Sequence, residues 1–364
     1  MAAMTVLGMM SGTSMDGVDA AVLVTDGQSI TAFGPHLFRP YTEMERSALR
    51  AALAEAPALT DRAARPGALA KAEQIVTDIH AEAAGQLLRE NPATKIELVG
   101  FHGQTVFHAP ERGLTVQIGD GPALARRLGV PVVYDLRAAD VAAGGQGAPL
   151  VPVYHRALFV RARFSGSMAI VNIGGVANIT RIGSDGSLVA GDTGPGNALI
   201  DDFVRVRTGR AMDAGGALAS AGKVNAAALD SLLALRWFDR PFPKSLDRNA
   251  FSIAPVANLS TEDGVATLAA FTSRTIVKGI VMAGGADRIV VAGGGASNPF
   301  LMHRLADEAG VPVASAADLG WSPDFIEAEA FAFLAARSLR GLPLTFPGTT
   351  GVKQPTTGGV LARP

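Results

Sequence analysis

Cysteine is absent from the 364-residue chain, which excludes disulfide bonds, thiolate metal sites and a cysteine nucleophile. Charged residues are sparse at 18%, and the net charge of −1 provides no basic field for nucleic acid and no polybasic patch for a membrane surface. No signal segment and no apolar run of membrane-spanning length are expected. These absences predict a cytoplasmic protein whose partners are small molecules or another copy of the chain.

Hydrophobic residues, by contrast, make up 48% of the chain, which is enough to bury the cores of two domains. The order of predicted strands and turns occurs twice along the sequence. In each half, three strands form a meander, and a further strand, a glycine turn and a helix follow. The predicted elements of the first half lie at residues 5–10, 20–25, 30–33, 96–99, 122–128 and 132–134, and those of the second at 168–173, 176–182, 188–190, 288–292 and 298–308.

This duplication predicts an α/β protein of two similar domains, each with a mixed sheet covered by helices, and a cleft between the domains. The predicted domains are 1–145 and 146–364, with the C-terminal helix packing back on the first. The boundary falls in the glycine-rich segment 144–149, which suits a hinge or a binding loop. A plain flexible connection is the alternative, but Pro149 and Pro152 favour an ordered turn.

The segment 10–19 places glycines, hydroxyls and carboxylates between two apolar strands. It lacks the lysine of a P-loop. The backbone N–H groups near Gly12 and Gly17, with the hydroxyls of Thr13 and Ser14, can nevertheless bind phosphate oxygens or their magnesium ion. A tight hairpin that uses glycine for its backbone angles is the alternative.

A second polar loop, residues 191–197, precedes a predicted helix at 198–207. The exposed N–H groups and the positive dipole end of such a helix attract an anion. A carboxylate in this loop therefore suggests that Asp192 is a general base or is linked to magnesium. The alternative is that Asp192 or Asn197 caps the helix.

The third loop, residues 293–299, contains three successive glycines that allow a flat ring to lie against the backbone. Adenine or ribose is the predicted ligand. The alternative is a capping turn, since Asn298-Pro299 would begin a helix in any protein. One glycine-rich loop is weak evidence, but three at matching places in a duplicated chain favour a nucleotide site.

Seven motifs, spread over nearly the whole chain, carry a resemblance to a known family. They lie at 8–19, 100–105 (Gly-Phe-His-Gly-Gln-Thr), 140–152, 172–178, 192–197 (Asp-Thr-Gly-Pro-Gly-Asn), 243–245 and 323–328. With them the chain resembles the actin and sugar-kinase superfamily, and within it the anhydro-N-acetylmuramic acid kinase family. The first motif and the one at 192–197 are together highly specific.

The resemblance implies two duplicated ribonuclease-H-like domains of the actin-like ATPase type, with a central cleft for ATP and substrate. It also implies a kinase of peptidoglycan recycling. Such an enzyme opens the ring of 1,6-anhydro-N-acetylmuramic acid with water and phosphorylates O6, giving N-acetylmuramic acid 6-phosphate and ADP. ATP and Mg²⁺ are the implied cofactors, and a homodimer without nucleic acid or membrane partners is the implied assembly.

The resemblance makes Asp192 the base that deprotonates the attacking water, and Glu327 a group that holds the substrate or that water. Without it, Glu327 would be interpreted as stabilising the N-terminus of a helix that begins near residue 322. The other implied substrate contacts are His102, Gly103, Gln104, Thr105 and Arg137. The implied ATP-binding residues are Gly12, Thr13, Ser14, Met15, Asp16, Gly17, Val18, Asp19, Gly174, Gly175, Asn178, Thr193, Gly194, Gly196, Asn197, Gly293, Gly294, Gly295 and Asn298, with Asp16 the candidate for Mg²⁺.

Some details depart from the family pattern. Lys244 and Arg248 match it, but the residues between them do not, and Thr350-Gly351-Val352 stands where Thr-Gly-Ala is usual. Arg137 would bind the lactyl carboxylate as a bidentate pair, or form a surface ion pair. The alternative functions are a kinase of another small sugar or carboxylate, which needs no water-activating base, and a sugar sensor or actin-like assembly protein, which nothing in the sequence supports.

Overall fold

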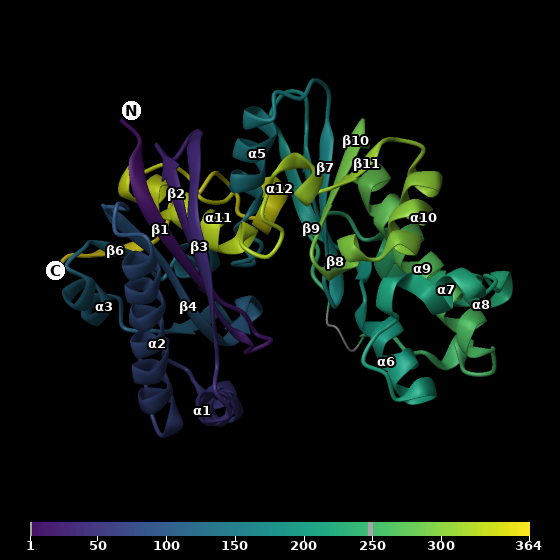
Figure 1. Ribbon diagram of the computed structural model, residues 1–364, viewed down its shortest axis with the longest axis horizontal. Helices are drawn as coiled ribbons and strands as arrows, with labels where there is room; N and C mark the ends of the chain where they lie inside the picture. Colours follow the sequence, from purple (N-terminus) through teal and green to yellow (C-terminus); the bar gives the residue numbers. More distant parts are fainter. Residues whose placement is uncertain (1, 247–249) are drawn as a thin grey trace. The chain divides into compact units, whose positions relative to one another are not determined.

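The computed structural model describes residues 2–246 and 250–364, so the expected match at Arg248 lies outside the described residues. The chain divides into a first unit, Met1–Arg161 with Asp324–Pro364, and a second unit, Ala162–Pro323. This division differs from the expected 1–145 and 146–364, because helix α5 (Pro152–Arg161) and the last 41 residues belong to the first unit. Figure 1 shows this C-terminal segment in yellow beside the purple N-terminal strands.

The first unit contains a seven-stranded sheet with the order β12-β6-β4-β1-β2-β3, and β5 pairs with β4. The first three strands form an antiparallel meander, while β1, β4 and β6 are parallel. The strands are β1 (Met4–Ser11), β2 (Gly17–Thr25), β3 (Ile30–Pro40), β4 (Leu98–Ala109), β5 (Leu114–Ile118), β6 (Val132–Tyr134) and β12 (Val360–Ala362), and the helices besides α5 are α1 (Glu43–Glu55), α2 (Ala68–Glu90), α3 (Gly121–Leu128), α4 (Ala138–Ala142), α11 (Ile326–Leu339) and α12 (Pro347–Thr350).

The second unit contains a five-stranded sheet with the order β11-β10-β7-β8-β9. The meander and the parallel strands follow one another as in the first unit, so the sequence duplication is a duplication of one ribonuclease-H-like arrangement. The strands are β7 (Met168–Ile173), β8 (Val176–Ile182), β9 (Leu188–Pro195), β10 (Arg288–Ala292) and β11 (Val313–Ser315), and the helices are α6 (Ala198–Thr208), α7 (Ala217–Ala221), α8 (Ala226–Leu233), α9 (Thr261–Met282) and α10 (Pro299–Ala309).

Helix α11 lies directly on β1 and β4 because two strand residues have no side chain. A Cβ atom on Gly8 would lie 1.8 Å from the carbonyl oxygen of Ala328, and one on Gly100 would lie 2.1 Å from that of Phe331. Both neighbours are helix backbone, which cannot rotate away as a side chain can. The expected turn glycine Gly100 is therefore a helix-packing glycine, and its strand continues past it.

Several other element boundaries also differ from the expected ones. Residues 100–105 lie inside β4 rather than in a loop after it, with a register irregularity near Gly103, whose φ is +70°. Strand β9 continues to Pro195, so Asp192 lies in a strand. The first glycine loop is shortened by β1 and β2 to residues 12–16. Glu327 is the second residue of α11 rather than one turn into a helix.

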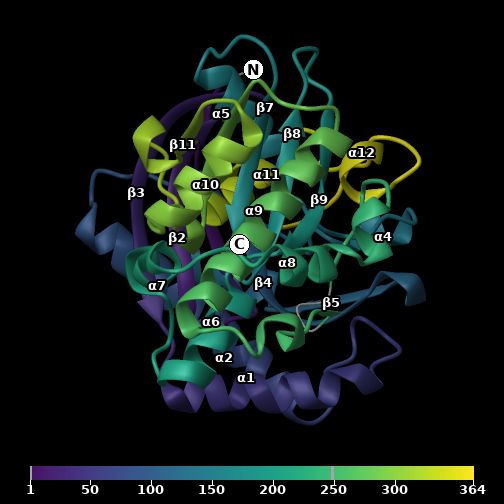
Figure 2. The same ribbon diagram turned by 90° about the vertical axis from the view of Figure 1, so that its right-hand side faces the viewer.

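Helix α9 is the centre of the second unit's core (Figure 2). It is long and apolar enough to cross a membrane by length and composition, contrary to the expectation that no such run exists. However, 72% of its apolar window is buried inside the protein. Its composition is explained by packing on the sheet, since a core helix passes the same test as a membrane span.

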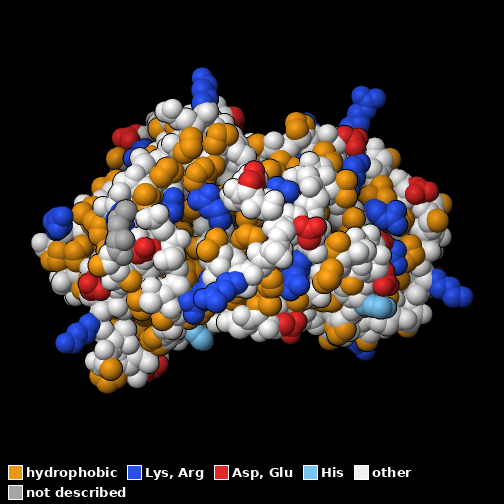
Figure 3. Space-filling model, turned by 90° about the horizontal axis from the view of Figure 1, so that it is seen from above, with side chains coloured by type: hydrophobic (Ala, Val, Ile, Leu, Met, Phe, Trp, Pro, Cys, Tyr) orange, Lys and Arg blue, Asp and Glu red, His pale blue; other side chains and the backbone are white. Residues whose placement is uncertain are grey.

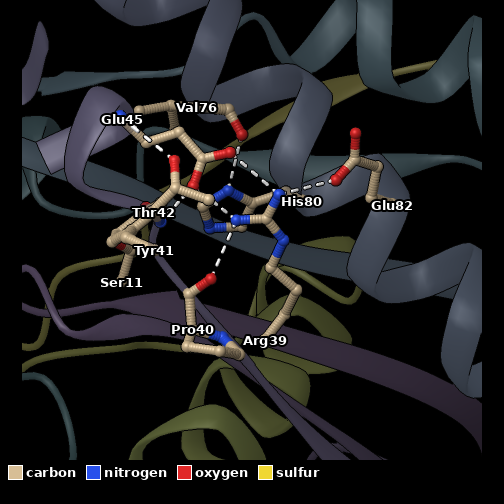
Figure 4. Close-up of polar contacts among 9 residues, drawn as sticks. All are labelled: Ser11, Arg39, Pro40, Tyr41, Thr42, Glu45, Val76, His80 and Glu82. Atoms are coloured by element: carbon tan, nitrogen blue, oxygen red, sulfur yellow. Dashed lines mark hydrogen bonds and ion pairs between the residues drawn. The ribbon is translucent and has the colours of Figure 1, made fainter.

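A partly exposed arginine fixes the start of α1 against α2 (Figure 4). Arg39 donates to both carboxylate oxygens of Glu45, at 2.5 and 2.9 Å, and to Glu82 at 2.8 Å. Glu45 also accepts from the backbone of Thr42, whose hydroxyl caps the helix in return.

Elsewhere the surface charges are mixed: on the face drawn in Figure 3, basic and acidic side chains are interspersed.

Candidate active site

The turn between β1 and β2 exposes two hydroxyls and a carboxylate. Thr13, Ser14 and Asp16 are exposed, while Met15 has a φ of 55°, which is unusual for a residue with a side chain. The carboxylate of Asp16 accepts from the Ser14 hydroxyl at 2.8 Å and from the backbone N–H of Gly17 at 3.1 Å. The turn is thus ordered by its own side chains.

A buried hydrogen-bond chain supports this turn from below. Ser11 donates to Gln104 Oε1 at 2.5 Å and bonds to the Tyr41 hydroxyl at 2.7 Å, and Gln104 Nε2 donates to the carbonyl of Gly12 at 3.1 Å. Figure 4 includes Ser11 and Tyr41. Gln104 is 0% exposed, so both ends of its amide are used inside the protein. Its place in the structure is beneath the turn, although a sugar contact was expected.

The remaining residues of the first loop belong to β2. Gly17 lies against the backbone of Arg39, where a Cβ would be 2.4 Å from the carbonyl oxygen, and Val18 is fully buried in the core. Asp19 is half-buried, and its pKa is raised to about 7 by burial and by the negative charges of Asp16, Glu327 and Asp324. Three other carboxyl groups of the first unit therefore disfavour ionisation of Asp19.

His102 is held as a neutral imidazole with a defined tautomer. Its Nδ1 lies 2.8 Å from the carbonyl of Gly103, to which only an N–H can bond, and its Nε2 accepts from Arg137 Nε at 3.0 Å. Burial and the nearby Arg137 charge hold the pKa of His102 well below its usual value. Thr105, the last of the four neighbouring candidates, accepts from Gln117 Nε2 at 3.1 Å.

Arg137 is oriented by two fixed partners. Besides His102, it donates through Nη1 to the carbonyl of Gly147 at 2.9 Å, so it is bound to a histidine and a carbonyl. Glu327 has solvent-accessible surface, but surrounding protein still raises its pKa through desolvation, while the Arg137 charge acts in the opposite direction. Arg137 and Glu327 therefore form the charged centre of the first unit's candidate site.

In the second unit, Asp192 is oriented by main-chain groups. Its carboxylate accepts from the N–H of Leu246 at 2.7 Å, and its own N–H donates to the carbonyl of Lys244 at 2.8 Å. Burial raises the pKa of Asp192 to about 6, and the Leu246 hydrogen bond acts against this rise. Asp192 does not cap α6, because it precedes the helix by six positions and lies opposite Asn178 on β8.

The Lys244 side chain itself points into the unit. Its Nζ donates to the carbonyl of Phe238 at 2.9 Å and lies 4.6 and 5.1 Å from the ring centres of Trp237 and Phe242. This explains why a buried lysine follows Pro243. The sequence carries no signal for the contacts of Asp192 with the Lys244 and Leu246 backbones, since main-chain atoms are the same in every residue type.

Three glycine-rich turns of the second unit lie side by side. The N–H of Gly196 donates to the carbonyl of Gly175 at 2.9 Å, and that of Asn197 to Gly174 at 2.7 Å. The turn that begins at Gly293 packs on strand β7, where a Cβ on Gly293 would lie 2.3 Å from Asn172 Oδ1. The predicted turn 174–175 and parts of the predicted loops 191–197 and 293–299 are thus brought together within one unit.

The polar side chains around these turns have mixed uses. Asn197 stands at the N-cap position of α6, but its side chain makes no capping hydrogen bond and instead donates through Nδ2 to the carbonyl of Ile173 at 3.2 Å. Asn298 caps α10 by accepting from Leu301, as its alternative interpretation predicted. Thr193 is buried, and its hydroxyl donates to the carbonyl of Ala177. The exposed parts of the three turns are therefore chiefly backbone.

Asp16 is the candidate carboxylate for a divalent ion. Over residues 2–246 and 250–364, no group of three or more His, Asp or Glu side chains is placed to hold a metal ion. Asp16 is exposed beside the hydroxyls of Thr13 and Ser14. An oxygen donor of this kind suits Mg²⁺ that keeps several waters and phosphate oxygens as its other ligands.

The chain resembles known proteins over its whole length. The family model described as anhydro-N-acetylmuramic acid kinase matches residues 4–363. Two curated relatives of that name, from Methylobacterium nodulans and Bradyrhizobium diazoefficiens, are 53% and 52% identical over 99% of this chain and 100% of their own length. Among solved structures, component A of (R)-2-hydroxyglutaryl-CoA dehydratase from Acidaminococcus fermentans is 12% identical over 93% of this chain and 99% of its own, with a TM-score of 0.48.

Proposed function

Because the chain belongs to the anhydro-N-acetylmuramic acid kinase family, we propose that it converts 1,6-anhydro-N-acetylmuramic acid, ATP and water to N-acetylmuramic acid 6-phosphate and ADP. The reaction is a phosphoryl transfer to an alcohol oxygen, joined to hydrolysis of the anhydro bridge. It would serve the recycling of peptidoglycan in the cytoplasm.

The observation that carries the proposal is the environment of Asp192. Its carboxylate is half-buried and fixed by the Leu246 N–H, and its pKa is raised to about 6. A carboxylate of that pKa is ionised at neutral pH and is a stronger base than an ordinary aspartate. Asp192 is therefore proposed to take a proton from the water that attacks the anomeric carbon.

The oxygen released from the anhydro bridge then needs no separate acid. As the C1–O6 bond breaks, its electron pair stays on O6, and O6 attacks the γ-phosphorus of ATP while the bond to ADP breaks. Attack of water opposite the departing bridge inverts the configuration at the anomeric carbon. Phosphoryl transfer requires mainly positioning and charge neutralisation, which backbone N–H groups and a bound Mg²⁺ would provide.

The remaining candidate residues are proposed to bind and orient. In the first unit, Arg137 and Glu327 would contact the sugar, the turn 12–16 would contact phosphate oxygens, and Asp16 would help to hold Mg²⁺. In the second unit, the exposed backbone of the three glycine turns contacts the nucleotide. His102 and Gln104 act through the groups that they hold, because both side chains are buried and hydrogen-bonded.

The first test is ADP release measured with 1,6-anhydro-N-acetylmuramic acid, with N-acetylmuramic acid and no sugar as controls. Release only with the anhydro sugar, and a 6-phosphate that carries solvent oxygen at C1, is the expected result. Activity with a different sugar alone would favour the other candidate, a kinase of another small sugar or carboxylate. Light scattering on the same samples tests the homodimer that the family resemblance implies.

The second test concerns Asp192. Asp192→Asn keeps the hydrogen bond from Leu246 but cannot accept a proton, so kcat is expected to fall by about 10²–10⁴-fold while ATP binding persists. In the wild-type enzyme, kcat/KM should fall below about pH 6, where Asp192 becomes protonated. Asp230→Asn, on helix α8, is the matched control. Near-normal turnover in Asp192→Asn would remove this residue from the role of base.

A further inference from the structure

The glycine-rich segment 144–149 is clamped by a buried aspartate and a threonine from distant parts of the chain. Asp140, which is 2% exposed, accepts from the N–H of Gly147 at 2.6 Å through Oδ1 and from the Thr350 hydroxyl at 2.6 Å through Oδ2. The carbonyl of Thr350 accepts from the N–H of Gln146 at 2.8 Å. Thr350 is itself 0% exposed, so water does not compete for these bonds.

The shape of the segment depends on the same residues. Gly147 has a φ of +69°, a conformation that favours glycine. A Cβ on Gly145 would lie 2.3 Å from Asp140 Oδ1 and 2.5 Å from Val352 Cγ1. The backbone therefore passes directly over the carboxylate, and the clamp leaves the Gly147 carbonyl with one orientation.

That carbonyl is one of the two groups that hold Arg137. The guanidinium donates through Nη1 to Gly147 and through Nε to His102. Since Nε is occupied, a carboxylate cannot bind side-on to Nε and Nη2. It can bind only end-on, to the second hydrogen of Nη1 and to Nη2. The clamp therefore determines from which direction Arg137 can receive an anion.

We propose that Asp140 and Thr350 are positioning residues that orient Arg137, through the Gly147 carbonyl, for end-on binding of the substrate's carboxylate. This inference rests on the proposed function, because it takes the acid group of the sugar as the ligand of Arg137. It explains a motif that the chemistry itself does not use: the glycine segment is a rigid support for a binding arginine rather than a hinge.

The test uses Thr350→Val, which keeps the side-chain shape and removes the hydroxyl, with Thr350→Ser as the conservative rescue. In Thr350→Val, KM for the anhydro sugar is expected to rise about tenfold or more, with little change in KM for ATP. Thr350→Ser should restore the wild-type value. Asp140→Asn provides a second variant, because its amide keeps an acceptor for Gly147.

Two comparisons separate positioning from a general structural effect. In an Arg137→Ala background, adding Thr350→Val should change KM less than twofold, since the two act through one group. A substrate analogue with a carboxamide in place of the carboxylate should bind Thr350→Val and wild-type enzyme equally. A full tenfold loss in the Arg137→Ala background, or with the carboxamide, would overturn the inference.

A measurement without substrate distinguishes this failure from failure of the proposed function. The Nε–H of Arg137 can be followed by NMR in ¹⁵N-labelled protein, because its bond to His102 protects it from solvent. Its hydrogen exchange should accelerate at least about tenfold in Thr350→Val and stay slow in Thr350→Ser. Unchanged exchange in Thr350→Val refutes the positioning whatever the substrate is, whereas an inactive wild-type enzyme with the expected exchange refutes only the substrate.

Discussion

The Asp192 carboxyl group destabilises the fold that carries it. Its pKa is about 6 in the folded protein and 3.8 in a model compound, so the folded state binds a proton more tightly than the unfolded state. By linkage, stability falls as the pH rises from about 4 to 6 and stays low above this range. Activity and stability thus make opposite demands on the ionised form of this residue.

Asp192→Asn should therefore be more stable than the wild-type protein at pH 8, by about 1–3 kcal/mol. The difference should shrink as the pH falls from 6 to 4, because the wild-type carboxyl group becomes neutral in the folded state. Urea unfolding at several pH values measures this gap. A variant that is less stable than wild type at pH 8 would show that the carboxylate stabilises its surroundings.

Single residues also show what sequence reasoning can and cannot reach. The motif at 192–197 predicts that Asp192 is a functional residue, because a carboxylate among glycines beside a predicted helix is chemically unusual. The groups that orient it are backbone atoms of Lys244 and Leu246, more than 50 positions away, and any residue type has these atoms. Likewise, the residue type of Gln104 predicts a polar contact but not that its partner is the carbonyl of Gly12.

Among the helices, α11 depends most on absent side chains. Gly8→Ala places a methyl group 1.8 Å from the Ala328 carbonyl oxygen and must displace the helix or bend β1. We expect the free energy of unfolding to fall by about 1–3 kcal/mol or more, as in other overpacked cores. Because α11 begins one residue before Glu327, kcat should also fall in the folded fraction.

Gly85→Ala is the control for this prediction. Gly85 lies inside α2, and its added Cβ would meet only the flexible end of Arg89, at 3.2 Å. Alanine in a helix interior usually stabilises by about 0.5–1 kcal/mol relative to glycine. Chemical denaturation of both variants compares them, and equal effects from Gly8→Ala and Gly85→Ala would mean that close helix packing is not the reason for Gly8.

The same packing explains which element boundaries the sequence predicts well. Strands β7, β8 and β10 lie where alternating and apolar runs predict them, because their ends coincide with turn residues. Strand β4 does not end at its predicted boundary. Gly100 was predicted to begin a turn because it is a glycine, but it lies within the strand, where α11 packs closely against it. A glycine in a turn and a glycine beneath a packed helix look alike in the sequence. Only the element that packs against the glycine in the folded protein distinguishes them.

The division of the chain predicts how its parts fold. The second unit, 162–323, is one continuous segment, whereas the first unit is made of two segments separated by it. The later segment supplies α11, which covers β1 and β4, and β12, which extends the sheet beyond β6. Tyr154 on α5 donates to Glu329 on α11 at 2.6 Å, so the two segments also share a buried polar bond.

A fragment of residues 2–161 should consequently expose apolar surface and bind a hydrophobic dye, while 162–323 should unfold cooperatively by itself. Adding a 324–364 peptide to the first fragment should restore cooperative unfolding. Because docking raises the pKa of Glu329 from 4.5 to about 7 through burial, it takes up a proton, and the peptide should bind more tightly as the pH falls through this range. A Glu329→Gln peptide should lack that part of the pH dependence; if it keeps all of it, the Tyr154–Glu329 contact does not form on docking.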